Sequence, residues 1–187
     1  MRKILWITAV LVFCTGALFA QQNLTWSLSL VRENEGVGFS RPVAMKDGES
    51  FSIIIQTNQA CYVYLIIQDS ERNLSVLLSK RSSANETLQT PLFTLTPPGG
   101  SETFYVVISA TEQKDLQAAI DAYKKQSDTR TARDLNNAIM EVRRSTSQFK
   151  ENPEKPVGMG GAFRGRAPAG TEYSGAGAYV KTIVITH

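Results

Sequence analysis

Histidine and cysteine are almost absent from this chain, and this restricts the chemistry it can perform. The single histidine is His187, the last residue, and the two cysteines are Cys14 and Cys61. Catalytic serine or cysteine nucleophiles need an oriented base within hydrogen-bond reach, and a chain end usually frays. Zinc sites need several histidine or cysteine ligands. We therefore predict no catalytic residue, no metal site and no cofactor, and a protein that is not an enzyme.

Long hydrophobic runs are also missing, except at the start of the chain. Arg2 and Lys3 precede an apolar run over residues 4–13, which is followed by small residues and then by polar Gln21. This order is typical of a cleavable secretory signal peptide, and the run is too short to span a bilayer stably. We predict a signal peptide over residues 1–20, with export to the periplasm or the extracellular space.

The processing of this N-terminal segment has alternatives. Cleavage after Ala20 is favoured, and cleavage after Ala17 comes next. A third interpretation, lipid attachment at Cys14, is disfavoured by the bulky Phe13 before it. No later apolar run approaches membrane length, so we predict no transmembrane segment after signal cleavage. Residues 21–187 are long enough to form a single domain with its own core.

A large excess of basic charge is missing as well. The whole chain carries a formal net charge of +3, from 20 basic and 17 acidic residues. Two of the basic residues, Arg2 and Lys3, lie in the predicted signal, so the remaining chain is nearly neutral. Nucleic-acid binding usually demands a clustered basic surface. We predict no nucleic-acid partner.

Strand patterns dominate the rest of the chain. Alternating segments, or segments rich in β-branched and aromatic residues, predict strands; they cover 23–32, 51–56, 61–67, 74–78, 92–95, 103–109 and 179–185. The connection between 51–56 and 61–67 has hairpin length, so these two strands are predicted to pair. Residues 33–47 are predicted to be a loop or an irregular edge, and residues 80–90 are predicted to be a loop. Cys61, the only cysteine left after signal cleavage, is predicted to be a buried hydrophobic residue.

Helical periodicity replaces the strand pattern over residues 113–149. Apolar residues recur there at helical spacing and predict two amphipathic helices that pack one face on the sheet. Thr111 and Asp128 are the expected N-caps, and Phe149 is expected on the apolar stripe of the second helix. The basic residues of the second helix leave a partner-binding helix as an alternative.

A glycine-rich tract over residues 153–178 predicts a long flexible loop. Its glycines are not followed by a Lys-Ser/Thr pair or by a helix, so they do not form a phosphate-binding loop. Phe163, Arg164 and Arg166 are candidate contacts for an anionic partner, with a mobile linker as the alternative. The strand over 179–185 must return to the sheet to pair its backbone.

Together these patterns predict a mainly β (α+β) fold. We expect an antiparallel β-sandwich-like domain with a two-helix insertion before the final strand.

Paired carboxylates are the remaining enzymatic hypothesis, because two acids suffice for sugar hydrolysis. Acidic residues lie mostly in the turns between strands, at Asp47, Glu49, Asp69, Glu71, Glu86 and Glu102. No spacing singles out two of them. A carboxylate-dependent hydrolase acting on cell-wall material therefore stands as the alternative function.

The central block resembles a known family. Its features are the turn at residues 46–50, the Tyr-Val-Tyr-Leu strand at 62–65, a leucine-rich strand at 74–78, and the Pro-Pro-Gly-Gly-Ser-Glu run before the strand at 103–109. This order resembles the bacterial family called domain of unknown function 4384, over about 43–110. The glycines of these turns, Gly48, Gly99 and Gly100, are expected to be structural turn residues.

The resemblance implies an exported envelope β-module with no established catalytic residues. We therefore expect a non-catalytic binding or interaction module of the bacterial cell envelope, whose partner is a protein or a glycan.

Overall fold

The computed structural model describes residues 23–145, 150–158 and 169–187. The predicted signal peptide, with Cys14, lies outside the described residues. The same holds for Phe149, Phe163, Arg164 and Arg166, so the predictions made for these residues stay predictions.

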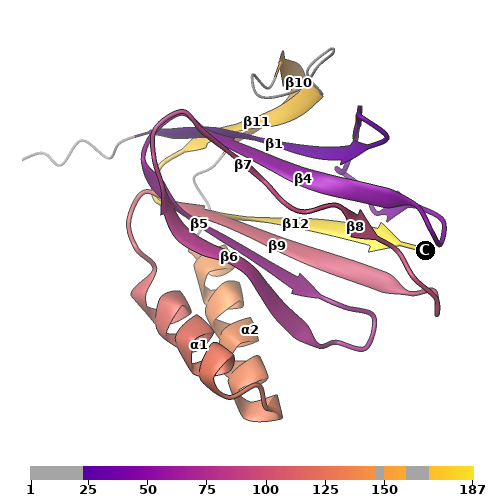
Figure 1. The fold of residues 1–187 in the computed structure, drawn as a ribbon. Helices are drawn as coiled ribbons and strands as arrows, with labels where there is room; N and C mark the ends of the chain where they lie inside the picture. The colour runs from indigo at the N-terminus through magenta and orange to yellow at the C-terminus, as the bar shows by residue number, and fades with distance from the viewer. Residues whose placement is uncertain (1–22, 146–149, 159–168) are drawn as a thin grey trace, which may run out of the picture.

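Two β-sheets face each other, and two helices cover the outer side of one of them (Figure 1). The first sheet has the strand order β10-β11-β1-β4-β7, with β2 paired to β1 and β8 paired to β4. Its strands are β10 (Lys150–Gly158), β11 (Ala169–Gly175), β1 (Leu24–Arg32), β4 (Ser50–Thr57), β7 (Glu86–Gln89), β2 (Glu35–Val37) and β8 (Phe93–Thr94).

The second sheet has the strand order β3-β12-β9-β5-β6. Its strands are β3 (Val43–Ala44), β12 (Ala178–Thr186), β9 (Ser101–Ser109), β5 (Cys61–Gln68) and β6 (Leu74–Ser82). All neighbouring pairs are antiparallel except β3 and β12, which run parallel. The structure confirms the predicted mainly β, sandwich-like fold with two helices.

The main core lies between the two sheets and is built by alternation along the strands. Trp26, Leu28 and Leu30 of β1 point toward the second sheet, from which Val106 and Ile183 face them, and all are fully buried. Burying one such side chain stabilises a fold by roughly 1.5–3 kcal/mol. The apolar residues of the alternating segments in the sequence therefore form this inter-sheet core.

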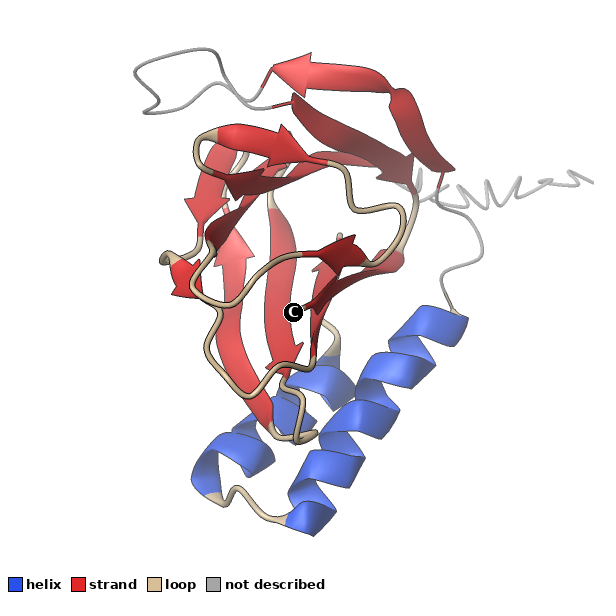
Figure 2. Cartoon of the chain, turned by 90° about the vertical axis from the view of Figure 1, so that its right-hand side faces the viewer, coloured by secondary structure: helices blue, strands red, loops and turns tan. Residues whose placement is uncertain are grey.

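A second core lies between the outer side of the second sheet and the helices α1 (Lys114–Lys125) and α2 (Thr129–Arg144). The sheet contributes Tyr64, Ile66, Tyr105 and Val107, and the helices contribute Leu116, Ile120, Leu135, Ile139 and Val142. Figure 2 shows both helices together on one side of the strands. The molecule is therefore a three-layer arrangement of sheet, sheet and helix pair.

The predicted caps of the two helices have different outcomes. Asp128 caps α2 as predicted, because its carboxylate accepts the backbone N–H of Thr131 at 2.8 Å. Thr111 does not cap α1, which begins after Gln113. The backbone N–H of Gln113 instead donates to the hydroxyl of Tyr64 at 3.2 Å. A buried tyrosine of the sheet therefore takes the place of the expected side-chain cap.

The predicted hairpin between 51–56 and 61–67 is wrong. The strand β4 lies in the first sheet and β5 lies in the second, so the short connection between them crosses from one sheet to the other. Both strands carry apolar residues on both faces, so the sequence pattern does not show which edges pair. Ile55 and Leu65 consequently meet in the inter-sheet core instead of lying side by side in one sheet.

The segment 33–47, predicted as a loop or an irregular edge, contains the short strands β2 and β3. Two segments predicted only as loops also contain strands. In the tract 153–178, β11 pairs with β1, and Tyr173 is fully buried against Trp26 with ring centroids 4.3 Å apart. In the segment 80–90, β6 continues to Ser82 and β7 pairs with β4. Both errors have one cause, since backbone pairing with an existing edge orders segments whose composition is typical of loops.

None of the helices that the structure describes is both long enough and apolar enough to cross a membrane.

Candidate functional site

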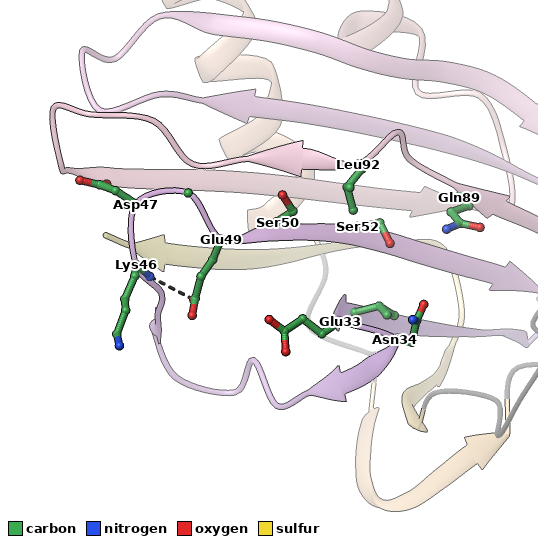
Figure 3. A pocket seen from close by; sticks show the side chains of 11 residues that line it. Glu33, Asn34, Lys46, Asp47, Glu49, Ser50, Ser52, Gln89 and Leu92 are labelled. Carbon is green, nitrogen blue, oxygen red and sulfur yellow. Dashed lines mark hydrogen bonds between the residues drawn. The ribbon is translucent and has the colours of Figure 1, made fainter.

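An open groove of about 640 Å³ lies on the outer face of the first sheet (Figure 3). One wall is the turn between β1 and β2, and the other is the turn that precedes β4. The groove is lined by Val31, Glu33, Asn34, Lys46, Asp47, Gly48, Glu49, Ser50, Ser52, Gln89 and Leu92. Most of these side chains are polar, so the groove suits a ligand that forms hydrogen bonds.

The β1–β2 wall is a two-residue turn with unusual backbone geometry. Arg32 and Glu35 pair across it, and Glu33 and Asn34 between them have φ values of 51° and 68°. Two left-handed residues in succession are the signature of a type I′ hairpin turn. Asn adopts this conformation readily, whereas Glu does so rarely. The turn therefore holds Glu33 at the groove at some cost in backbone strain.

The opposite wall is built around Gly48, whose φ of 85° lies in the left-handed region. The backbone N–H of Glu49 donates to the carbonyl of Lys46 at 3.0 Å and closes the turn. The carboxylate of Glu49 accepts the backbone N–H of Lys46 at 3.0 Å and lies 3.4 Å from Arg32 Nη1. These bonds fix the orientation of an acid at the groove, although an exposed ion pair adds little stability.

The third acid of the groove, Asp47, is joined to the end of the chain. Its Oδ1 lies 2.8 Å from Nδ1 of His187, whose side chain is only 2% exposed. Because a carboxylate only accepts, the Nδ1–H of the imidazole donates in this bond. The other ring nitrogen lies 3.8 Å from Glu102 Oε1, too far for a hydrogen bond.

The expectation that His187 frays is wrong. Its backbone N–H donates to Gly100 at 3.1 Å, and its carbonyl accepts the N–H of Gly100 at 2.9 Å. The preceding residue, Thr186, also accepts the backbone N–H of Met45 at 2.8 Å. The chain end is therefore held between two segments, because β12 is flanked by β3 and β9.

The three turn glycines of the sequence have different structural roles. Gly48 supplies the positive φ of its turn. Gly99 and Gly100 are instead required by close packing: a Cβ at Gly99 would lie 2.7 Å from the carbonyl oxygen of His187, and one at Gly100 would overlap the side chain of Ser70. These two glycines let the β8–β9 connection approach the chain end and the β5–β6 turn.

The groove brings together two of the six candidate acids, Asp47 and Glu49, and adds Glu33. The structure places the other candidate acids elsewhere. Asp69 and Glu71 accept hydrogen bonds from Asn73 within the β5–β6 turn. Glu86 is bonded to Lys80 and to the backbone N–H of Ser83, and these bonds lower the pKa of its carboxyl group.

Neither a reactive thiol nor a metal cluster is present in the part of the chain that the structure describes. Cys61 is buried as predicted, and this burial raises the pKa of its thiol to about 11. The thiol is therefore protonated at neutral pH and is a poor nucleophile. Within the same residues, no three histidine, cysteine or acidic side chains converge as metal ligands.

Sequence reasoning missed Glu33, Asn34 and Gln89 as groove residues. A signal for the first two does exist in the sequence, because Glu-Asn-Glu-Gly follows an alternating strand and Asn is typical of two-residue hairpin turns. No such signal exists for Gln89. It reaches the groove only because β7 pairs with β4, a pairing between distant segments.

The fold and the groove define a two-sheet β-module with a helical cover and a polar surface site. Residues 44–112 match the family model described as Domain of unknown function (DUF4384). This match confirms the predicted resemblance over this part of the chain. The matched segment contributes β4 to β9 and therefore strands of both sheets. The comparisons found no match to a curated protein or to a solved structure.

Proposed function

We propose that this protein is an exported, non-catalytic module of the bacterial cell envelope that binds a protein or a glycan partner through the polar groove. The observation that supports this best is the construction of the groove. Both of its walls are tight turns with left-handed residues, and the carboxylate of Glu49 is oriented by hydrogen bonds. A site whose polar groups are fixed before binding loses less entropy when a ligand binds.

The chemistry of the groove favours a partner that donates hydrogen bonds. Glu33, Asp47 and Glu49 contribute carboxylate oxygens, and Asn34 and Gln89 contribute amide groups. Hydroxyl groups of a glycan and basic or amide side chains of a protein are donors of this kind. The predicted signal peptide supports a partner that lies outside the cytoplasm.

Capture of the partner from the cell envelope tests this proposal. The processed chain would carry a tag at its N-terminus, because His187 is packed at the other end. Proteins and wall fragments cross-linked to it would be identified by mass spectrometry. The double variant Glu33→Gln/Gln89→Ala should lose the captured partner by about tenfold, which corresponds to roughly 1.4 kcal/mol.

The matched control is Glu141→Gln, because Glu141 is 75% exposed on α2, far from the groove residues in sequence and on another element. This variant should capture the partner as well as the unchanged protein does. If the groove variant captures as much partner as the unchanged protein does, the groove is not the binding site. Failure of the unchanged protein to capture any envelope component would contradict the binding function itself.

The alternative function, a carboxylate-dependent hydrolase acting on cell-wall material, has one observation in its favour. In Figure 3 the side chains of Glu33 and Glu49 extend from opposite walls into the same space. Two carboxyl groups on either side of a substrate are the arrangement that sugar hydrolysis requires.

Release of soluble fragments from purified cell walls tests this alternative. Under the hydrolase hypothesis, Glu33→Gln and Glu49→Gln each abolish release, whereas Glu141→Gln does not. Under the binding proposal, the unchanged protein retains wall fragments or a protein without cleaving them.

A further inference from the structure

A second cavity, of about 350 Å³, lies between the two sheets at their open side. We call it the edge slot. It is lined by Ile53, Ile55, Leu65, Leu77, Leu78, Lys80, Thr87, Leu88, Gln89, Thr90 and Pro91. Its floor is the inter-sheet core, since Ile53, Ile55 and Leu65 are fully buried members of that core.

A short connection between the two sheets closes one end of the slot. The short connection from β6 to β7 joins the sheet edges there, and Thr57 and Ser82 hydroxyls are 3.0 Å apart beside it. Glu86 adds bonds to the backbone N–H of Ser83 at 2.7 Å and to Lys80 at 2.5 Å. Away from this connection β6 and β7 diverge (Figure 1), and residues of both strands line the slot.

A β-bulge in β6 directs two leucines to the slot. Leu65 pairs with Leu78 and Ile66 pairs with Val76, so Leu77 is an extra residue without a partner in β5. The bulge reverses the alternation of β6. Consequently both Leu77 and Leu78 line the slot, and Leu77 remains 38% exposed. Bulges commonly redirect side chains next to binding sites.

The edge of the second sheet lies beside the slot. The strand β6 is nine residues long, and no strand in the described ranges pairs with its outer edge. Unpaired backbone groups beside an apolar pocket are the elements that strand-adding domains use. In these domains the added strand pairs with the edge, and its side chains enter pockets.

The basic side chains of β6 indicate which kind of segment can pair with its outer edge. Lys80 lies on the slot side of β6, and Arg81 lies on its helix side. A second copy of β6 whose pairing is centred on these two residues would bring the same basic side chains together, which is unfavourable. Glu86 balances only one of the two charges, through Lys80. An acidic segment is therefore preferred over a self-complementary dimer.

We propose that the edge slot binds an extended segment of a protein partner, which adds a strand to β6. A bulky apolar side chain of this segment enters the slot beside Leu77, and an acidic residue of the segment lies on the helix side of the sheet, against Arg81. The edge slot shares Gln89 with the polar groove, and this proposal does not depend on the function proposed for that groove.

Selection from a phage-displayed library of random peptides, against the whole processed chain, tests the proposal. The expected enriched peptides contain a bulky apolar residue near an acidic one. One enriched peptide is then synthesised with a fluorescent label, and its affinity is measured by anisotropy. Leu77→Asp should weaken binding by at least about tenfold, and Arg81→Gln by a few fold, with the second effect shrinking at high salt.

Leu92→Asp is the matched control, because Leu92 is the other exposed large hydrophobic residue in the described part of the chain and does not line the slot. It should leave peptide affinity unchanged. A peptide with N-methyl groups on alternate amides should lose binding, since it cannot pair with a strand edge. Circular dichroism would establish whether each variant is folded, and Leu77→Ala would replace Leu77→Asp if the latter is not.

Three results would overturn the proposal. The first is a selection that yields no common motif, or peptides that bind Leu77→Asp as well as the unchanged chain. The second is a dimer, seen by sedimentation, that Leu77→Asp dissociates, since a second copy would then occupy the edge. The third is saturable binding of a fatty acid such as laurate that excludes every selected peptide, which would make the slot a lipid site.

Discussion

The imidazole of His187 donates a hydrogen bond to the carboxylate of Asp47, with 2.8 Å between Nδ1 and Oδ1. The two residues are separated by 140 positions. Asp47 belongs to the turn that forms one wall of the polar groove, so the end of the chain supports that wall. This bond, the backbone bonds of His187 to Gly100 and the pairing of β3 with β12 hold the turn in place.

His187→Ala should therefore destabilise the protein and loosen the groove wall. The loss includes one charge-assisted hydrogen bond and a buried ring, and we expect about 1–2 kcal/mol, because Asp47 itself is partly exposed. Asp47→Asn keeps an acceptor for Nδ1–H and should cost less than half as much. Urea unfolding of both variants measures the difference. If both variants lose the same stability, the negative charge of Asp47 is required for the stabilisation, and an uncharged acceptor at this position is not enough.

The glycines of the turns allow a graded test of backbone geometry. Gly48→Ala places a Cβ at a φ of 85° and should cost about 1 kcal/mol. Gly100→Ala forces the new methyl group against Ser70 and should cost about 1–3 kcal/mol.

Gly38→Ala is the matched control for these two changes. Nothing lies within 4 Å of its added Cβ, and its φ is not in the left-handed region. It should be neutral or slightly stabilising. Thermal unfolding ranks the three variants by stability. A stability loss in Gly38→Ala as large as that in Gly100→Ala would contradict the packing explanation.

Acid should weaken the connection between β6 and β7. The bonds from Lys80, from the backbone of Ser83 and from Ser82 lower the pKa of Glu86 in the folded state. A group with a lowered folded pKa contributes stability that is present above its unfolded pKa and is lost as the pH falls through the folded value. The unfolding midpoint of Glu86→Gln should thus be lower than that of the unchanged protein at neutral pH.

The same difference should shrink as the pH falls below about 4, near the ordinary pKa of glutamate. Urea titrations at several pH values measure it for both proteins. A difference that stays constant down to the lowest pH would show that the carboxylate charge contributes nothing at this connection.

The thiol of Cys61 should resist modification in the folded protein. Burial raises its pKa to about 11, so very little thiolate forms at pH 8, and reagents have no access to it. Its reaction with a disulfide reagent should follow unfolding. An introduced Ser75→Cys, at an exposed position of β6, should react quickly in the same conditions. Fast reaction of Cys61 itself would indicate local opening at the start of β5.

The elements that the sequence predicted correctly are those whose pattern is local. The alternation of β1 and the helical periodicity around Leu135 and Ile139 each reflect a single element and the face it buries. Pairing is not local. The chain between β4 and β5 is short enough for a hairpin, yet the two strands enter different sheets. Because both strands have apolar residues on two faces, the sequence pattern does not show which strands pair.

The groove could be predicted only in part, for the same reason. The turn at Gly48 is marked by an Asp-Gly pair and carries Asp47 and Glu49. Glu33 and Gln89 come from segments far away in the sequence and join the site through the pairing of β1 and β7 with β4. His187 was expected to fray because a residue at the end of the sequence carries no sign of what its strand will pack against.

The strand β11 shows most directly how packing overrides a loop-like composition. Its tract is rich in glycine, and among the residues of β11 only Tyr173 carries a large side chain into the core, where its ring stacks on Trp26 with an interplanar angle of 16°. Tyr173→Ala should therefore cost about 3–5 kcal/mol and detach β11 from β1. Tyr173→Phe keeps the ring and should cost far less.

Trp26 reports this change directly, because the other tryptophan, Trp6, lies in the predicted signal peptide. In the processed Tyr173→Ala variant, its emission should shift to the red before the helices unfold, as followed by circular dichroism. In the Tyr173→Phe variant the two transitions should coincide. A coincident transition in both variants would mean that β11 is held by its backbone pairing and not by the aromatic stack.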